Sequence, residues 1–162
     1  MARAFDIRPL RDDERDWARE LVRERWGGET MVTRGAVYEP AELDAFVAVD
    51  EDGECIGLVT YRIDGDECEI CSLDSLVEGM GIGTALVEAV GVRAHRAGCR
   101  RVVVVTTNGN VRVQRLYGRL GFRVAAVRPG AVNEARKLKP AIPLVGQDGV
   151  PINDEIELER PP

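Results

Sequence analysis

The stretch Glu78-Gly79-Met80-Gly81-Ile82-Gly83-Thr84 decides how the rest of the chain is interpreted. Its three alternate glycines lie between a strand-like run at 68–73 and a helical run at 84–97. Glycine lets a backbone turn sharply and approach a ligand closely. A helix that starts after such a loop directs its first N–H groups, and the positive end of its dipole, at one place. The stretch therefore predicts an anion site of the kind that holds a phosphate.

Two common phosphate loops do not fit this spacing. A dinucleotide-binding loop has G-x-G-x-x-G after the first strand and an acid at the end of the next strand. Here the spacing is G-x-G-x-G in mid-chain, and the next strand ends in Thr106-Thr107. A Walker loop needs Gly-Lys-Ser/Thr, whereas Gly83-Thr84 has no lysine. A tight turn without a ligand remains the plain alternative.

The hydrophobic pattern around the loop predicts a mixed α/β domain. Apolar residues at helical spacing predict a first helix that starts at Asp12 or Asp13 and ends near Arg25. Strand–helix–strand order around the glycines predicts a right-handed crossover. The expected strands are 5–8, 45–49, 55–63, 68–73, 102–105 and 122–127, with further strand character at 30–38, and the expected helices are 12–25, 84–97 and 111–120.

Length, charge and cysteine content narrow the class of protein. A chain of 162 residues with a net charge of −6 predicts one acidic globular domain, not a protein built to grip nucleic acid. No apolar run approaches the ~18 residues that span a bilayer, and no leader is evident, so we expect a cytoplasmic protein. Cys68-x-x-Cys71 lacks a second ligand pair, so we expect reduced thiols and no metal site.

Two blocks resemble a known family. Residues 78–84, the helix after them and the strand at 102–107 resemble the acetyl-coenzyme A loop of the GNAT superfamily of N-acetyltransferases. The family pattern R/Q-x-x-G-x-G/A, often R-G-x-G-I-G-T/S, is matched by Gly79, Gly81, Ile82, Gly83 and Thr84. A second block, an Asn followed by a helix with Tyr and then Gly-Phe, is matched by Asn110, Leu116-Tyr117, Gly121 and Phe122. The family's Arg or Gln at the head of the loop is Glu78 here, which we expect to turn to solvent or to pair with a base.

The resemblance covers roughly residues 5–127 and implies a bacterial-type single domain. It implies a mixed, mostly antiparallel central sheet of six to seven strands, flanked by about four helices. The strands near 68–74 and 102–107 would splay apart. We expect an acetyltransferase-like region at 1–136, and at 137–162 an extension of the same domain with a short terminal strand or arm.

The implied chemistry is transfer of an acetyl group from acetyl-coenzyme A to a primary amine, by direct attack in a ternary complex. Tyr117 corresponds to the family's general acid, with a core aromatic as the alternative. Glu69 is a candidate base, because strand alternation groups it with Cys71 and Leu73; an exposed glutamate is equally compatible. The residues expected at the coenzyme are Leu73, Asp74, Gly79, Met80, Gly81, Ile82, Gly83, Thr84, Asn110 and Arg115.

Each role has a physical reason. A backbone N–H near Leu73 or Asp74 would polarise the thioester carbonyl. Arg115 lies in a stripe with Arg112 and Arg119 that suits the 3′-phosphate of the coenzyme, or else simply faces solvent. The only histidine, His95, is expected at the surface.

The sequence does not identify the acceptor. We expect a small-molecule or peptide amine, bound in a pocket that Trp26, Arg34 and Tyr38 would line. A homodimer is compatible with the sequence. The alternatives in other classes are a coenzyme A-binding regulatory module without turnover, and an interaction domain that docks through its acidic terminal arm at 154–159.

Overall fold

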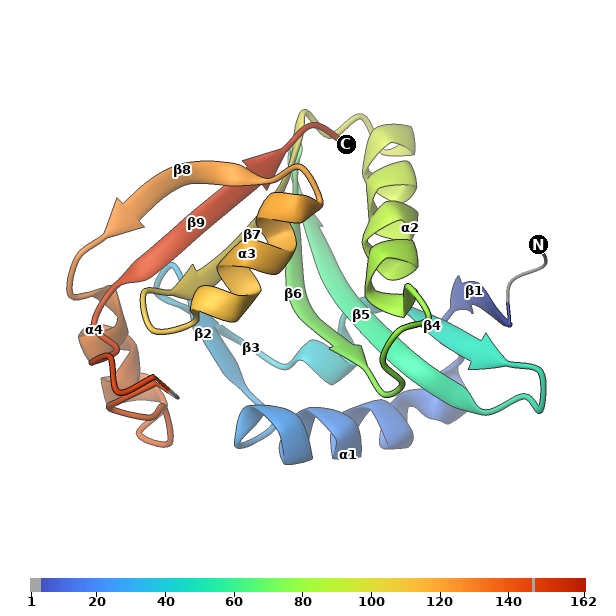
Figure 1. Cartoon of the computed structure of the whole chain (residues 1–162), viewed down its shortest axis with the longest axis horizontal. Helices are drawn as coiled ribbons and strands as arrows, with labels where there is room; N and C mark the ends of the chain where they lie inside the picture. The colour runs from blue at the N-terminus through green and yellow to red at the C-terminus, as the bar shows by residue number, and fades with distance from the viewer. Residues whose placement is uncertain (1–3, 147) are drawn as a thin grey trace.

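The computed structural model describes residues 4–146 and 148–162, and its centre is one seven-stranded sheet (Figure 1). The strands lie in the order β1-β4-β5-β6-β7-β9-β8, and β6–β7 is the parallel pair among antiparallel neighbours. Their bounds are β1 Phe5–Pro9, β4 Asp44–Asp50, β5 Cys55–Asp64, β6 Glu67–Ser75, β7 Arg101–Thr107, β8 Arg123–Arg128 and β9 Glu155–Arg160. The predicted mixed, mostly antiparallel sheet is confirmed.

Helices and a small hairpin cover the two faces of this sheet. The helices are α1 (Arg15–Trp26), α2 (Ile82–Arg96), α3 (Val111–Arg119) and α4 (Ala131–Leu138), and the hairpin is β2 (Met31–Thr33) with β3 (Ala36–Tyr38). In Figure 1, α2 and α3 lie in front of the sheet and the hairpin lies behind it. We call these the front and back faces. Alternation along β5 gives each face a core, since Val59 packs with α2 and Leu58 packs with α1.

The first helix starts later than expected. Asp12 and Asp13 form a 3-10 turn, and α1 begins only at Arg15. The prediction that one of these aspartates caps the helix is therefore wrong. Glu14 precedes the helix without capping it through its side chain: its carboxylate accepts the backbone N–H of Arg11 at 2.9 Å, within the 3-10 turn, and pairs with the Arg8 guanidinium at 2.8 Å.

The predicted splay between β6 and β7 is confirmed by their register. The strands pair only from Glu67–Arg101 to Ile70–Val104, although both continue beyond this point. The register of β6 against β5 shifts at the same place and leaves Cys71 without a partner. Such a bulge bends a strand and increases its twist. The bulge therefore accounts for the opening of the sheet at Cys71.

The last third of the chain contributes to the central sheet. The expected boundary at 136 lies inside α4. The terminal strand β9 pairs with β7 on one side and β8 on the other, so it is an inner strand of the sheet and not a free arm. Ile156 and Leu158 pack into the front core, while Glu155 and Glu157 are buried on the back face.

All four cysteines are free thiols, and Cys68, Cys71 and Cys99 are buried. No helix in the described part of the chain is long and apolar enough to cross a membrane.

Candidate active site

The glycine loop forms an open cradle at the start of α2. Gly79 and Gly81 have φ values of +80° and +75°, a region that side chains other than glycine rarely adopt. The helix begins at Ile82, two residues before the expected start, and its first bond in the ladder is from Ala85 N–H to Gly81 O at 3.0 Å. The N–H groups of residues 82–84 thus have no acceptor in the helix.

Open space lies beside this cradle. A Cβ atom built on Gly79, Gly81 or Gly83 would meet no atom within 4 Å. Glu78 at the head of the loop is exposed, so its carboxylate is free to stay in water and away from an anion in the cradle. The donors, the dipole and the free space together fit a phosphate group.

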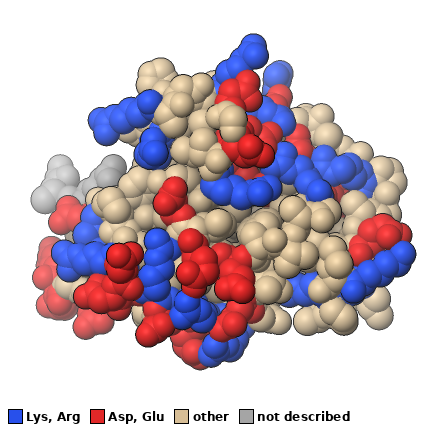
Figure 2. All heavy atoms as spheres, turned by 180° about the vertical axis from the view of Figure 1, so that it is seen from behind, with Lys and Arg blue, Asp and Glu red and all other residues tan. Residues whose placement is uncertain are grey.

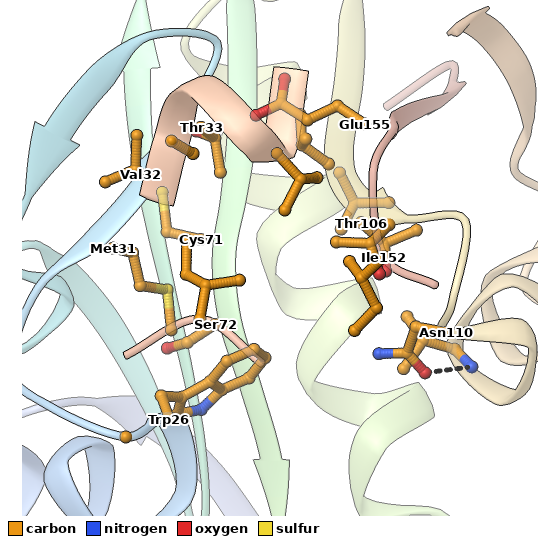
Figure 3. A pocket seen from close by; sticks show the side chains of 18 of the residues that line it. Trp26, Met31, Val32, Thr33, Cys71, Ser72, Thr106, Asn110, Ile152 and Glu155 are labelled. Carbon is orange, nitrogen blue, oxygen red and sulfur yellow. Dashed lines mark hydrogen bonds between the residues drawn. The ribbon is translucent and has the colours of Figure 1, made fainter. Parts of the chain in front are cut away.

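A cavity of about 430 Å³ at the splay is lined by residues from both faces of the sheet. Its front half is lined by β7 and α3, with Asn110, Val113, Leu116 and Tyr117. Its back half is lined by the end of α1, strand β2, α4 and the segment at 139–143. In Figure 3, Met31, Val32, Cys71 and Ser72 face Thr106, Ile152 and Asn110 across the cavity.

Tyr117 is both a core aromatic and a cavity residue. Only 3% of it is exposed, and its ring packs edge-on against Phe122 with centroids 5.1 Å apart. No described residue bonds its hydroxyl group. Burial raises the pKa of the Tyr117 phenol, and the nearby Asp74 raises it further. The phenol therefore stays protonated at physiological pH and is a hydrogen donor at the cavity.

The residues expected at the coenzyme differ in where they lie. Asn110 caps α3, because its Oδ1 accepts the N–H of Val113 at 3.4 Å, and it lines the cavity. Leu73 also lines the cavity. Asp74 faces the other way: its Oδ2 accepts Trp26 Nε1–H at 3.0 Å, and burial raises the pKa of this carboxyl group. Asp74 thereby holds the indole that forms one end of the cavity.

The other members of the expected set lie on or near the surface. Met80 packs against the front core, while Thr84 is exposed. Arg115 is exposed together with Arg112 and Arg119, and none of the three has an ion-pair partner among the described residues. This arginine stripe is therefore free for a ligand or for water. His95 is exposed, as expected.

Glu69 is surrounded by donors and does not line the cavity. Only 1% of this residue is exposed. Its Oε1 accepts N–H groups of Arg34 at 2.7 Å and of Arg62 at 3.0 Å, and its Oε2 accepts the Thr33 hydroxyl at 2.8 Å.

The prediction that Glu69 and Leu73 share one face of β6 is wrong, because the bulge at Cys71 breaks the alternation of side chains along this strand. Leu73 packs toward the front core, whereas Glu69 faces the hairpin.

Of the three residues expected to line an acceptor pocket, Trp26 lines the cavity. Arg34 and Tyr38 instead bond to Glu69.

Glu69 belongs to a larger set of paired charges on the back face, which we call the ionic layer. The layer joins the turn between β2 and β3 to the strands β5, β6, β7, β8 and β9. Its members are Arg34, Arg62, Arg101 and Arg128 with Glu67, Glu69, Glu155, Glu157 and Glu159. Figure 2 shows the molecule from this side, where acidic and basic side chains lie next to one another and do not separate into blocks.

Lys139 is a site residue that the sequence did not reveal. Its Nζ donates to the backbone carbonyls of Trp26 at 2.8 Å and Thr30 at 2.6 Å. Burial lowers the pKa of its amino group. These bonds tie the segment after α4 to the end of α1 and close the back half of the cavity. The described residues contain no group of three or more His, Cys, Asp or Glu side chains that could hold a metal ion.

The fold and the site together define an acetyltransferase of the GNAT type, and comparison with known proteins agrees. The sequence profile of the acetyltransferase (GNAT) family matches residues 8–122, so the chain belongs to this family. It is 47% identical over 137 residues to the uncharacterized protein YdhI of Bacillus subtilis (strain 168), a match that covers 85% of this chain and 86% of YdhI.

Solved structures share the fold. A GNAT family acetyltransferase from Elizabethkingia anophelis with acetyl-CoA bound has a TM-score of 0.69 at 18% identity, over 98% of this chain and 99% of that one. A Bacillus subtilis acetyltransferase in complex with CoA has a TM-score of 0.64 at 17% identity, over 98% and 97% of the two chains.

Proposed function

We propose that this chain transfers the acetyl group of acetyl-coenzyme A to a primary amine of its acceptor in a ternary complex. The observation that supports this most strongly is the cavity at the splay, because two substrates that enter from opposite faces can meet there directly. Coenzyme-bound structures of similar fold support the choice of donor.

The residues present fit the donor substrate. The N–H groups at 82–84 and the open space beside the glycines would hold the pyrophosphate. Beyond Ile70, the edge of β6 that faces β7 has no strand partner, so its backbone groups are free to bond the pantetheine arm. A backbone N–H near Leu73 would stabilise the oxyanion that forms at the thioester carbon. Arg115 is the candidate for the 3′-phosphate.

Two protons must move during transfer. The amine attacks the carbonyl carbon, the C–S bond breaks, and the departing thiolate takes a proton. Tyr117 is the proposed donor of that proton, because its protonated phenol lies at the cavity and no described residue bonds it. The amine must also lose a proton.

Glu69 is poorly placed to take the amine's proton, since its oxygens already accept from Arg34, Arg62 and Thr33. We assign it the role of positioning the hairpin, and we keep its role as a base as the competing hypothesis.

A module that binds coenzyme A without turnover is the second candidate, favoured by Glu78 and by the lack of an evident base. Incubation with labelled acetyl-coenzyme A and a panel of amines separates the two. Acetylated amine detected by mass spectrometry supports the enzyme. Calorimetric binding of coenzyme A without transfer to any amine would overturn it.

A further inference from the structure

The back half of the cavity also carries information about the acceptor. Building on the proposed function, we propose that the acceptor is a small amine with an apolar body and a single positive charge, and not a polyamine or a protein terminus. The inference depends on the lining, the charges and the walls of this half of the cavity.

The lining is mostly apolar. Side chains from four separate segments converge on the back half, and the ones that define it are Trp26, Met31, Val32, Val132, Ala135 and Ile152. Figure 3 shows Met31 and Val32 on one side and Ile152 on the other, with Trp26 at one end. A pocket lined in this way gains affinity from the apolar surface that a ligand buries.

The charges at this half do not favour a second cation. Three charged residues line it: Arg25, Lys139 and Glu155. Glu155 is 4% exposed, and its carboxylate already accepts Arg34 N–H at 3.1 Å and Arg128 Nε–H at 3.1 Å. The only lining carboxylate among the described residues is thus compensated, and two lining residues are cations. A polycationic acceptor would lose water here without gaining an ion pair.

The size of the cavity also bears on the size of the acceptor. The Lys139 bonds to Trp26 and Thr30 fasten the segment at 139–143 across the back of the cavity. The whole cavity measures about 430 Å³, and its front half must also admit the acetyl-bearing end of the coenzyme. The remaining volume suits one ring or a short branched chain, whereas a peptide terminus needs an open groove.

Three amines test the inference against the full-length protein: phenethylamine, spermidine and an alanine-initiated hexapeptide. Product is measured by mass spectrometry with acetyl-coenzyme A in excess, and coenzyme binding is measured by calorimetry. We expect kcat/KM for phenethylamine to exceed that for the other two by at least about tenfold. A preference for spermidine or the peptide overturns the inference and leaves the proposed acetyl transfer intact. No product from any amine, with the coenzyme bound, overturns both.

A matched pair of variants places the acceptor in this half. Val32 on β2 lines the cavity, and its register partner Val37 on β3 is 51% exposed and does not line it. Val32→Asp adds an unpaired carboxylate to the cavity wall, so kcat/KM should fall at least about tenfold for phenethylamine and rise for spermidine. Val37→Asp should change neither, and both variants should bind coenzyme A as the parent does. Equal effects of the two substitutions would overturn the assignment.

Discussion

Glu69→Gln separates a structural role of Glu69 from a catalytic one. The substitution keeps the shape of the side chain but removes the negative charge from a residue that is 1% exposed. Three cationic N–H donors bond its Oε1: Arg34 Nη2 at 2.7 Å, Arg62 Nη2 at 3.0 Å and Arg62 Nε at 3.1 Å. These bonds become bonds to a neutral amide.

The magnitude follows from the strength of those bonds. Hydrogen bonds to a charged group contribute about 1.5–3 kcal/mol, against about 0.5–1.5 kcal/mol for neutral pairs. Two arginines are affected, but their side chains are 22% and 31% exposed, so water replaces part of the loss. We expect a loss of about 2 kcal/mol in the free energy of unfolding, equivalent to a fall in Tm of about 4–8 °C for a chain of this size.

Urea unfolding and steady-state kinetics on the same preparation give the answer. At temperatures where the variant stays folded, kcat should change by less than about threefold, whereas loss of a general base costs about 10²–10⁴. Glu134→Gln is the matched control, since Glu134 pairs with Lys137 at the surface with both side chains 72% exposed, and it should leave unfolding unchanged. A fall in kcat of about 10² with unaltered unfolding would refute the structural role and make Glu69 the base.

Three further changes test other parts of the structure. Gly83→Val occupies the open space beside the cradle, so coenzyme A affinity measured by calorimetry should vanish. The thermal unfolding curve should stay nearly unchanged, because Gly83 lies in α2 with a helical φ. Retained affinity would place the phosphate elsewhere. Tyr117→Phe should lower kcat about 10²-fold with coenzyme affinity intact, and an unchanged kcat would remove its role as the acid. Arg8 holds the pKa of Glu14 at about 2, below its ordinary value of 4.5, so this pair stabilises the fold fully above pH 4.5 and loses its effect as the pH falls toward 2. The Tm of the parent should therefore fall more steeply between pH 5 and 2.5 than that of Glu14→Gln, and parallel curves would contradict the assignment.

The sequence predicted those parts of the fold that local signals encode. The alternate glycines placed the cradle, the β-branched run at 102–105 placed β7, and Asn110 placed the start of α3, each within two residues. These elements depend on neighbours in the chain, through turn conformation, side-chain branching and capping.

What the sequence could not predict depends on distant partners. The alternation of apolar and acidic residues in β9 was visible, but nothing in it says that the strand inserts between β7 and β8. The bulge at Cys71 exists only relative to β5, and it moved Glu69 away from the face of Leu73. The eight-residue α4 is rich in good helix formers but was missed, because eight residues span only about two turns and give a weak periodic signal.

The ionic layer helps to fix one wall of the cavity. The hairpin that supplies Met31, Val32 and Thr33 to the cavity wall has strands of three residues each, too short to be stable alone.

Arg34, in the turn between β2 and β3, has a left-handed φ of +51°. This conformation costs a residue other than glycine about 1–2 kcal/mol. The bonds from Arg34 to Glu67, Glu69 and Glu155 offset this cost and fix the hairpin against the sheet. Glu69, the carboxylate that the sequence offered as a candidate base, is thus bonded to the turn of this hairpin. Together with Glu67 and Glu155, it fixes the hairpin whose strand β2 lines the cavity.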